Sequence, residues 1–205
     1  MALLHGTAEL VPSKRELLAE WMPQQPWFHG GEIKPLGSFR FDDPDGEVGM
    51  ESIILTADGH TYQAAMTYRA APLDGGRLIG TMDHSVLGPR WAYDATSDPV
   101  FAAALGTTIL TGGTQAPLVR DTGTETVAVD PVVTVQGSGV PGAEIETIEL
   151  LGSEVTDEGT LMETSGPNLV LIHDLEGGAK TMGDHRLTGQ WDGVQSALLA
   201  VARLR

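Results

Sequence analysis

The amino-acid sequence predicts an α+β fold: a mainly antiparallel, curved sheet with two helices packed on it, followed by a second, strand-rich half. Three observations support this prediction. Two segments carry helix start signals, two strand-like segments flank the pair Asp58-Gly59, and short strand-like segments separated by glycines follow residue 125. A chain of 205 residues suits one domain, or two small ones that share a core.

The first helix is predicted to begin at Ser13, because Ser13 and Glu16 have the spacing of a capping box that satisfies two free backbone N–H groups. The apolar residues that follow form one helical stripe, made of Leu17, Leu18, Trp21 and Met22. Pro23 ends this helix, because proline cannot continue the backbone hydrogen bonding.

The second helix is predicted to begin at Asp98-Pro99, an N-cap residue followed by proline at the first helical position. Its apolar residues recur every four positions, at Phe101, Leu105 and Ile109. The helix is expected to end before two consecutive glycines at positions 112 and 113.

Strands account for most of the remaining chain. Residues 47–56 and 60–68 are predicted to form an antiparallel hairpin, because Asp58-Gly59 suits a turn that needs positive φ. Residues 77–82 and 90–95 form a second expected pair. Residues 111–125 are rich in Gly, Thr and Pro and are expected to connect two subdomains.

The second half is predicted to consist of short strands. The candidate segments are 126–136, 144–151, 161–164, 168–174, 187–191 and 197–203. The last segment could instead be a helix, because a short apolar run does not decide between the two. The expected organisation is therefore an α+β subdomain over residues 1–115 and a strand-rich subdomain over residues 116–205.

Composition and charge exclude several classes of protein. The chain has no cysteine, so it has no disulfide scaffold, cysteine nucleophile or thiolate zinc site. A formal net charge of −16 disfavours binding to nucleic acid and to anionic membrane surfaces. No apolar stretch approaches the roughly 20 residues of a membrane span, and the N-terminus shows no secretory signal. A cytoplasmic protein is the expectation.

Two glycine-rich motifs resemble nucleotide-binding sequences but fit them poorly. Residues 137–142 match G-x-G-x-x-G, yet Pro141 lies inside the motif and a carboxylate-rich segment follows it, so a plain turn is expected. Residues 177–181 lack the glycine spacing of a phosphate-binding loop, and a hairpin loop carrying Lys180 is expected there.

No catalytic or metal-binding motif emerges from local spacing. Three of the six histidines neighbour an aspartate: Asp83-His84, His173-Asp174 and Asp184-His185. Adjacent strand residues face opposite sides, so such a pair cannot reach one metal ion unless the backbone turns there. The serines lack the spacing of a nucleophile elbow, and the acidic residues 42–47 are interpreted as a solvated turn. No metal and no cofactor are predicted.

The few aromatic residues concentrate in two places. Trp21, Trp27 and Phe28 surround a proline-rich turn, and Trp91 and Tyr93 lie in the second predicted hairpin. The favoured interpretation is that they form the core of the first half. The alternative is that Trp27 or Trp91 is an exposed platform for a sugar ring or a partner protein.

Two segments resemble the N-terminal cap domain of bacterial maltokinases. Residues 13–31 run from a helix through a proline to a Trp-aromatic-x-Gly turn, and residues 90–102 resemble the Tyr-Asp-Ala strand and Asp-Pro helix of the same domain. Together they cover roughly residues 3–115. Maltokinases phosphorylate maltose with ATP in a pathway that joins trehalose to α-glucan synthesis. Their catalytic machinery lies in a two-lobed, aminoglycoside-phosphotransferase-like body beyond the cap.

The sequence departs from that kinase pattern. Phosphoryl transfer needs a lysine on the nucleotide, a catalytic Asp with a downstream Asn, and a metal-binding Asp. The chain has only Lys14, Lys34 and Lys180, and Asn168 is its only asparagine. The segment 168–175 resembles the strand that carries the ATP lysine, but His173 or a neighbour occupies that position. The second half is therefore interpreted as a degenerate, kinase N-lobe-like segment.

These observations lead to the hypothesis of a non-catalytic, maltokinase-cap-like protein that acts as a binding or regulatory module. The resemblance links it to trehalose, maltose or α-glucan metabolism. Its acidic surface suits a protein partner with a basic face, and a small sugar is the other expected ligand. The alternative is a sugar- or sugar-phosphate-binding protein or an unrecognised carbohydrate-active enzyme. The candidate binding residues are Trp27, Phe28, His29, Gly30, Arg90 and Trp91.

Overall fold

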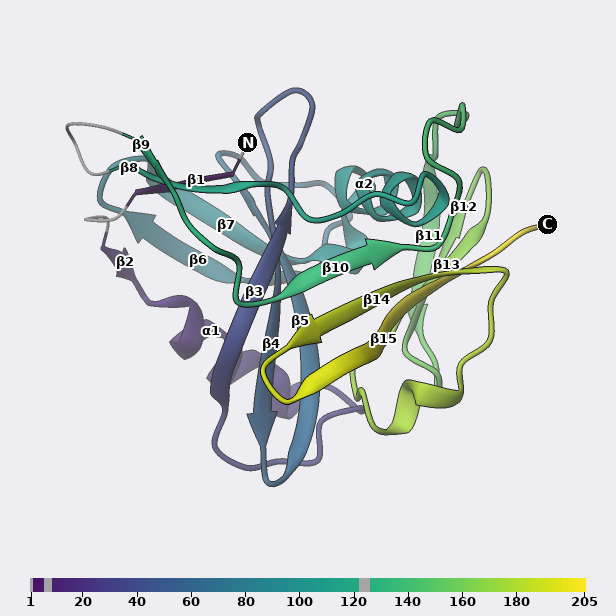
Figure 1. Cartoon of the computed structure of the whole chain (residues 1–205). Helices are drawn as coiled ribbons and strands as arrows, with labels where there is room; N and C mark the ends of the chain where they lie inside the picture. Colours follow the sequence, from purple (N-terminus) through teal and green to yellow (C-terminus); the bar gives the residue numbers. More distant parts are fainter. Residues whose placement is uncertain (1, 6–8, 122–125) are drawn as a thin grey trace.

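The computed structural model describes residues 2–5, 9–121 and 126–205 (Figure 1). Within these residues, two six-stranded sheets and one three-stranded sheet accompany two short α-helices. Nearly all strand pairs are antiparallel, so the predicted α+β class with mainly antiparallel sheet is confirmed. Among the described helices, none is both long and apolar enough to cross a bilayer.

The first six-stranded sheet has the strand order β2-β6-β7-β5-β4-β3. Its strands are β2 (Leu10–Val11), β3 (Lys34–Phe41), β4 (Gly49–Ala57), β5 (His60–Arg69), β6 (Leu78–His84) and β7 (Gly88–Asp94). Helix α1 (Lys14–Trp21) packs its apolar residues on one face of this sheet. The capping box is confirmed, because Ser13 Oγ accepts a hydrogen bond from the amide of Glu16 and the Glu16 carboxylate accepts one from the amide of Ser13.

The β4–β5 hairpin turns at Asp58 and Gly59, whose φ values are 48° and 85°. Both residues therefore adopt the positive φ that the sequence predicted for this turn, and β6 and β7 form the second predicted pair. Strand β3 was not predicted. It begins with Lys34-Pro35 and contains Gly37, and proline and glycine are both disfavoured in strands.

The second six-stranded sheet has the order β10-β14-β15-β13-β12-β11. Its strands are β10 (Thr134–Gly137), β11 (Leu150–Val155), β12 (Thr160–Thr164), β13 (Asn168–Leu171), β14 (His185–Trp191) and β15 (Val194–Arg203). The open question at residues 197–203 is settled as strand, since β15 pairs with β13 on one side and β14 on the other. The predicted strand 144–151 is wrong over residues 144–149, which have no regular structure.

The predicted connection over residues 111–125 contains a strand. Strand β8 (Leu118–Asp121) pairs in parallel with β1 (Ala2–His5) and antiparallel with β9 (Thr126–Ala128), whereas residues 122–125 lie outside the described residues. The predicted strand 126–136 is two strands, β9 and β10, separated by residues 129–133. Pairing between distant segments makes β8 a strand, and local composition carries no signal of such pairing.

Helix α2 (Pro99–Leu110) packs in the core that the two six-stranded sheets share. The helix begins as predicted, with the Asp98 carboxylate accepting a hydrogen bond from the amide of Val100 at 3.0 Å. This core includes Phe39 of β3 together with Val135 of β10 and Leu199 of β15. The two halves therefore share one hydrophobic core, and the predicted boundary near residue 115 stays a prediction.

The glycine-rich segment 137–142 begins with the last residue of β10, and its turn lies against the C-terminal end of α2. The amide of Gly139 donates to the carbonyl of Ile109 at 2.8 Å, and a Cβ on Gly139 would lie 1.8 Å from the carbonyl oxygen of Leu110. Glycine is thus needed for the backbones to approach. The segment at 177–180 is a 3₁₀ turn, η3 (Gly177–Lys180), between β13 and β14. These strands are not neighbours in the sheet, so the predicted hairpin loop is wrong.

Candidate functional site

A cleft of about 450 Å³ lies between the first sheet and the second half of the chain. Its lining residues come from three turns: Pro26, Trp27 and His29 after η1 (Met22–Gln24); residues 155–159 at the β11–β12 turn; and His173, Asp174 and Gly177 after β13. The lining combines aromatic and aliphatic carbon with carboxylate, hydroxyl and imidazole groups. Segments far apart in the sequence therefore build one polar cleft.

The turn at residues 27–31 places His29 beside the β4–β5 hairpin. Gly30 and Gly31 have φ values of 99° and 96°, and a Cβ on Gly31 would lie 2.9 Å from the backbone nitrogen of Asp58. The backbone amide of His29 donates to the hydroxyl of Tyr62 at 3.3 Å. The two glycines thus let the turn reverse and pack against the hairpin that carries His60.

Trp27 is packed into this junction, with only 9% of its surface exposed. Its ring stacks on the His173 ring, with centroids 4.3 Å apart and planes 5° apart, and it meets the edge of Trp21 at 5.8 Å. These contacts favour the interpretation of Trp27 as a core residue. His173 covers one face of the Trp27 ring, and an edge of the ring lines the cleft.

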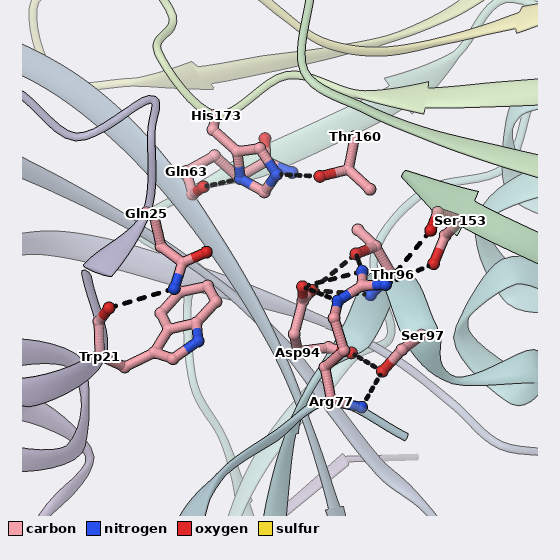
Figure 2. Close-up of polar contacts among 10 residues, drawn as sticks. All are labelled: Trp21, Gln25, Gln63, Arg77, Asp94, Thr96, Ser97, Ser153, Thr160 and His173. Carbon is pink, nitrogen blue, oxygen red and sulfur yellow. Dashed lines mark hydrogen bonds and ion pairs between the residues drawn. The ribbon is translucent and has the colours of Figure 1, made fainter. Parts of the chain in front are cut away.

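His173 is a buried, neutral histidine that connects the two sheets (Figure 2). Its Nδ1 donates to the carbonyl of Gln63 on β5 at 3.1 Å, because a carbonyl can only accept. Its Nε2 therefore accepts the hydroxyl hydrogen of Thr160 on β12 at 2.7 Å. Burial lowers the pKa of His173 below its ordinary value. The residue is thus a structural link rather than a phosphate ligand.

Asp174 is positioned by backbone pairing between its own segment and the start of β5. The amide of Gln63 donates to the carbonyl of His173 at 2.8 Å, and the amide of Leu175 donates to the carbonyl of Thr61 at 2.9 Å. Between these two bonds, Asp174 lies opposite Tyr62. This pairing places the Asp174 side chain at the end of β5 where His60 begins the strand.

The carboxylate of Asp174 is oriented by backbone amides. Its Oδ1 accepts hydrogen bonds from the amides of Glu176 at 3.1 Å and Gly177 at 3.2 Å, and its Oδ2 lies 3.2 Å from Nε2 of His29. Burial raises the pKa of Asp174, but these hydrogen bonds and the nearby His60 outweigh it and hold the pKa below its ordinary value. The group is a carboxylate at neutral pH.

His60 completes a group of three potential metal ligands. Its Nδ1 lies 3.8 Å from Asp174 Oδ2, and its ring meets the His29 ring edge-on with centroids 5.0 Å apart. One ligand atom from each of His29, His60 and Asp174 lies within 4.8 Å of the other two. The sequence predicted no metal site because neither the adjacent Asp–His pairs nor any helical histidine motif suited one, whereas the structure brings together residues from three separate turns.

The six predicted binding residues separate into two places. Trp27 and His29 line the cleft, Phe28 packs on Tyr62 with centroids 5.2 Å apart, and Gly30 gives the turn its positive φ. Arg90 and Trp91 lie on β7 and are not among the described lining residues of the cleft, and the Arg90 guanidinium donates to the carbonyl of Pro89 at 2.8 Å.

The structure adds Thr156, Asp157, His173 and Asp174 to the cleft, and the sequence had not selected any of them as a binding residue. His173 and Asp174 had been considered as a poor local metal motif, and His173 also as the residue in the place of the ATP lysine. The sequence feature that could have indicated this site is its position at the end of a predicted strand. Beyond a strand the backbone turns, and adjacent side chains no longer have to point to opposite faces.

A second polar network fixes the two sheets against each other (Figure 2). The Arg77 guanidinium donates through Nε to Asp94 at 3.0 Å and through Nη1 to Ser153 Oγ on β11 at 2.7 Å. Its backbone amide donates to Ser97 Oγ at 2.8 Å. The arrangement joins the end of β7 in the first sheet to β11, an outer strand of the second sheet.

The turn at residues 27–31, strands β3 to β7 and the N-cap Asp98 form one continuous unit of the fold. Residues 21–98 match the maltokinase N-terminal cap domain. The match confirms the resemblance indicated by the sequence. The cap-like region contributes Trp27, His29 and His60 to the site, and the other half contributes Asp157 and Asp174. No curated protein and no solved structure matches the chain.

Proposed function

We propose that this maltokinase-cap-like protein is a non-catalytic binding module that takes a neutral sugar of one or two rings in the cleft between its halves. The observation that carries the proposal is the cleft itself, whose volume of about 450 Å³ suits a small ligand. The match to a maltokinase domain supports a ligand from trehalose, maltose or α-glucan metabolism. We keep a cytoplasmic location as an expectation that fits such a domain.

The chemistry of the cleft favours an uncharged, hydroxyl-rich ligand. Asp157 and Asp174 offer carboxylate acceptors, Thr156 offers a hydroxyl, and Trp27 presents aromatic carbon. Glu158 is engaged by Arg203, whose Nη2 lies 2.8 Å from both carboxylate oxygens. The described lining contains no lysine or arginine, so in the absence of a bound cation a sugar phosphate would meet negative charge without compensation.

The positions of the lysines and the asparagine support a function without phosphoryl transfer. Lys14 is paired with Glu51, Lys34 begins β3 and Lys180 lies in the η3 turn. Asn168 accepts a hydrogen bond from Arg205. These residues lie on separate elements, whereas a kinase needs a lysine, an Asp and an Asn converging on one nucleotide and its magnesium.

Isothermal titration calorimetry tests the proposal with maltose, trehalose, glucose, glucose phosphates and ATP. With protein that has been treated with a chelator, we expect saturable binding of at least one neutral sugar and no binding of the phosphorylated compounds. Asp157→Asn should weaken sugar binding by about tenfold or more, because it removes a charged acceptor from the cleft. Asp192→Asn, in the exposed turn between β14 and β15, is the matched control and should bind as the parent protein does.

Three results would count against the proposal. If no neutral sugar gave measurable binding and a defined basic protein co-purified with the chain, a protein-binding module would be favoured instead. Equal binding by the Asp157→Asn variant would place the sugar elsewhere. An ATP-hydrolysing activity that persists in rigorously purified protein would show that the protein is catalytic. Trp27→Ala is a poor probe of binding, because the side chain is packed into the junction.

A further inference from the structure

We propose that His29, His60 and Asp174 form a binding site for a zinc-like divalent cation that connects the cap-like region to the second half of the chain. The three side chains come from the 27–31 turn, the start of β5 and the segment after β13. Two imidazoles and one carboxylate are a ligand set that zinc and neighbouring first-row metals prefer. The proposal does not depend on sugar binding.

The distances suit a small metal ion with modest adjustment. Bonds of about 2.1 Å place neighbouring ligand atoms of a tetrahedral zinc ion about 3.4 Å apart. The Asp174 Oδ2 atom lies 3.2 Å from His29 Nε2 and 3.8 Å from His60 Nδ1. The two imidazoles keep their ligand atoms within 4.8 Å of each other. Because the His29 side chain is 53% exposed, its ring is free to make a shift of about 1 Å.

An unsatisfied nitrogen points to a missing ligand partner. His60 Nδ1 is shielded from solvent and has no hydrogen-bond partner, although the His60 side chain as a whole is partly exposed. A buried polar atom without a partner is costly, and an ion is one of its ordinary explanations. A cation placed between His29, His60 and Asp174 would satisfy this nitrogen.

The surroundings hold the carboxylate in a ligating orientation. The amides of Glu176 and Gly177 bind Asp174 Oδ1, which leaves Oδ2 directed at the two histidines. Such outer hydrogen bonds are the usual means of fixing a metal ligand. His29 and Asp174 also line the cleft, so three protein ligands would leave a coordination position facing it.

Calorimetry with zinc chloride and the tag-free, chelator-treated 205-residue chain tests this proposal in the absence of any sugar. We expect one saturable site with a dissociation constant below about 10 µM, and no comparable binding of magnesium, which prefers oxygen ligands. Zinc should also raise the melting temperature, since a ligand that binds only the folded state stabilises it. Cobalt(II) should give visible d–d absorption bands from the same site.

Variants separate this site from adventitious binding. His29→Ala and His60→Ala should each weaken zinc binding by about tenfold or more and remove the cobalt bands. Asp174→Asn should weaken it similarly while keeping an oxygen for the two backbone amides. His185→Ala on β14 is the matched control and should leave binding unchanged.

The proposal would be overturned by the absence of saturable zinc binding, by equal affinity for magnesium, or by unchanged zinc binding in the His29→Ala/His60→Ala double variant. Circular dichroism checks that each variant is folded. The His29 side chain is 53% exposed, so His29→Ala is the variant least expected to disturb folding. Zinc binding without sugar binding would contradict only the proposed sugar-binding function. Sugar binding without zinc binding would contradict only the proposed metal site.

Discussion

Glu51→Gln is expected to destabilise the first sheet by removing a buried negative charge. Glu51 lies on β4, and its carboxylate pairs with the ammonium group of Lys14. It also accepts hydrogen bonds from the hydroxyls of Ser38 at 2.9 Å and Tyr68 at 3.2 Å, and Arg40 Nη2 lies 3.5 Å away. The variant would leave two cations facing a neutral amide, which is costly in a buried site.

The magnitude follows from the pKa of Glu51. Burial by itself raises this pKa, but Lys14 and Arg40 outweigh burial and lower it from 4.5 to about 2. Since one pKa unit corresponds to about 1.4 kcal/mol, the carboxylate contributes about 3 kcal/mol to the free energy of unfolding at neutral pH. A lowered folded-state pKa gives a contribution that is present above pH 5 and is lost as the pH falls toward 2.

Urea unfolding at pH 7 and pH 3 measures this effect. Between these pH values the parent protein should lose about 2 kcal/mol more stability than Glu51→Gln, because the variant has no charge to lose at that position. Glu154→Gln, at an exposed position on β11, is the control and should follow the parent protein. Parallel losses in the parent protein and Glu51→Gln would refute the reasoning.

Three further predictions concern closely packed positions elsewhere in the fold. Trp27→Ala should cost about 3–5 kcal/mol in urea unfolding, because it removes a buried ring stacked on His173; an unchanged midpoint would contradict that packing. The His173 ring should titrate below pH 6.5 by NMR, since burial favours the neutral form, and stability should fall as the pH drops through 6.5; a higher midpoint would count against it. Gly139→Ala should lower the free energy of unfolding by about 3 kcal/mol or more, because the added Cβ would overlap a carbonyl of α2. The control is Gly152→Ala, where the Cβ faces open space and stability should change by less than about 1 kcal/mol. Equal melting temperatures of the two variants in thermal unfolding would refute this prediction.

Elements with strong local signals were predicted correctly. The capping box at Ser13, the Asp98-Pro99 start of α2 and the Asp58-Gly59 turn each depend on a few consecutive residues. Hydrogen bonding to the neighbouring backbone and restricted φ values act over that same short range. The sequence therefore contained the physical cause of each of these features.

Elements that depend on distant partners were predicted poorly. Strand β3 contains proline and glycine and becomes a strand through pairing with β4, and β8 does so through pairing with β1 and β9. Conversely, residues 144–149 were predicted as a strand but form no strand, although the backbone amide of Ser165 donates to the carbonyl of Glu149 at 2.9 Å. Strand formation requires a neighbour, and neither composition nor periodicity identifies that neighbour.

The same distinction applies to the candidate site. The sequence directed attention to Trp27 and His29 through the aromatic turn and its likeness to maltokinase caps, and both residues line the cleft. The carboxylate that faces His29 belongs to Asp174, which is 145 residues away. The segment carrying it reaches His29 and His60 by pairing with the start of β5.

The sequence by itself thus determined the helix boundaries, the main hairpin turns, the acidic character and the resemblance of residues 13–31 and 90–102 to maltokinase caps, which the match over residues 21–98 confirms. The tertiary structure decided that the two sheets share one core, that Trp27 is packed against His173, and that two histidines meet one aspartate. The physical reason is the sequence distance over which the interactions act. Caps and turns depend on residues that are neighbours in the chain, whereas clefts and ligand sets form where packing brings separate segments together.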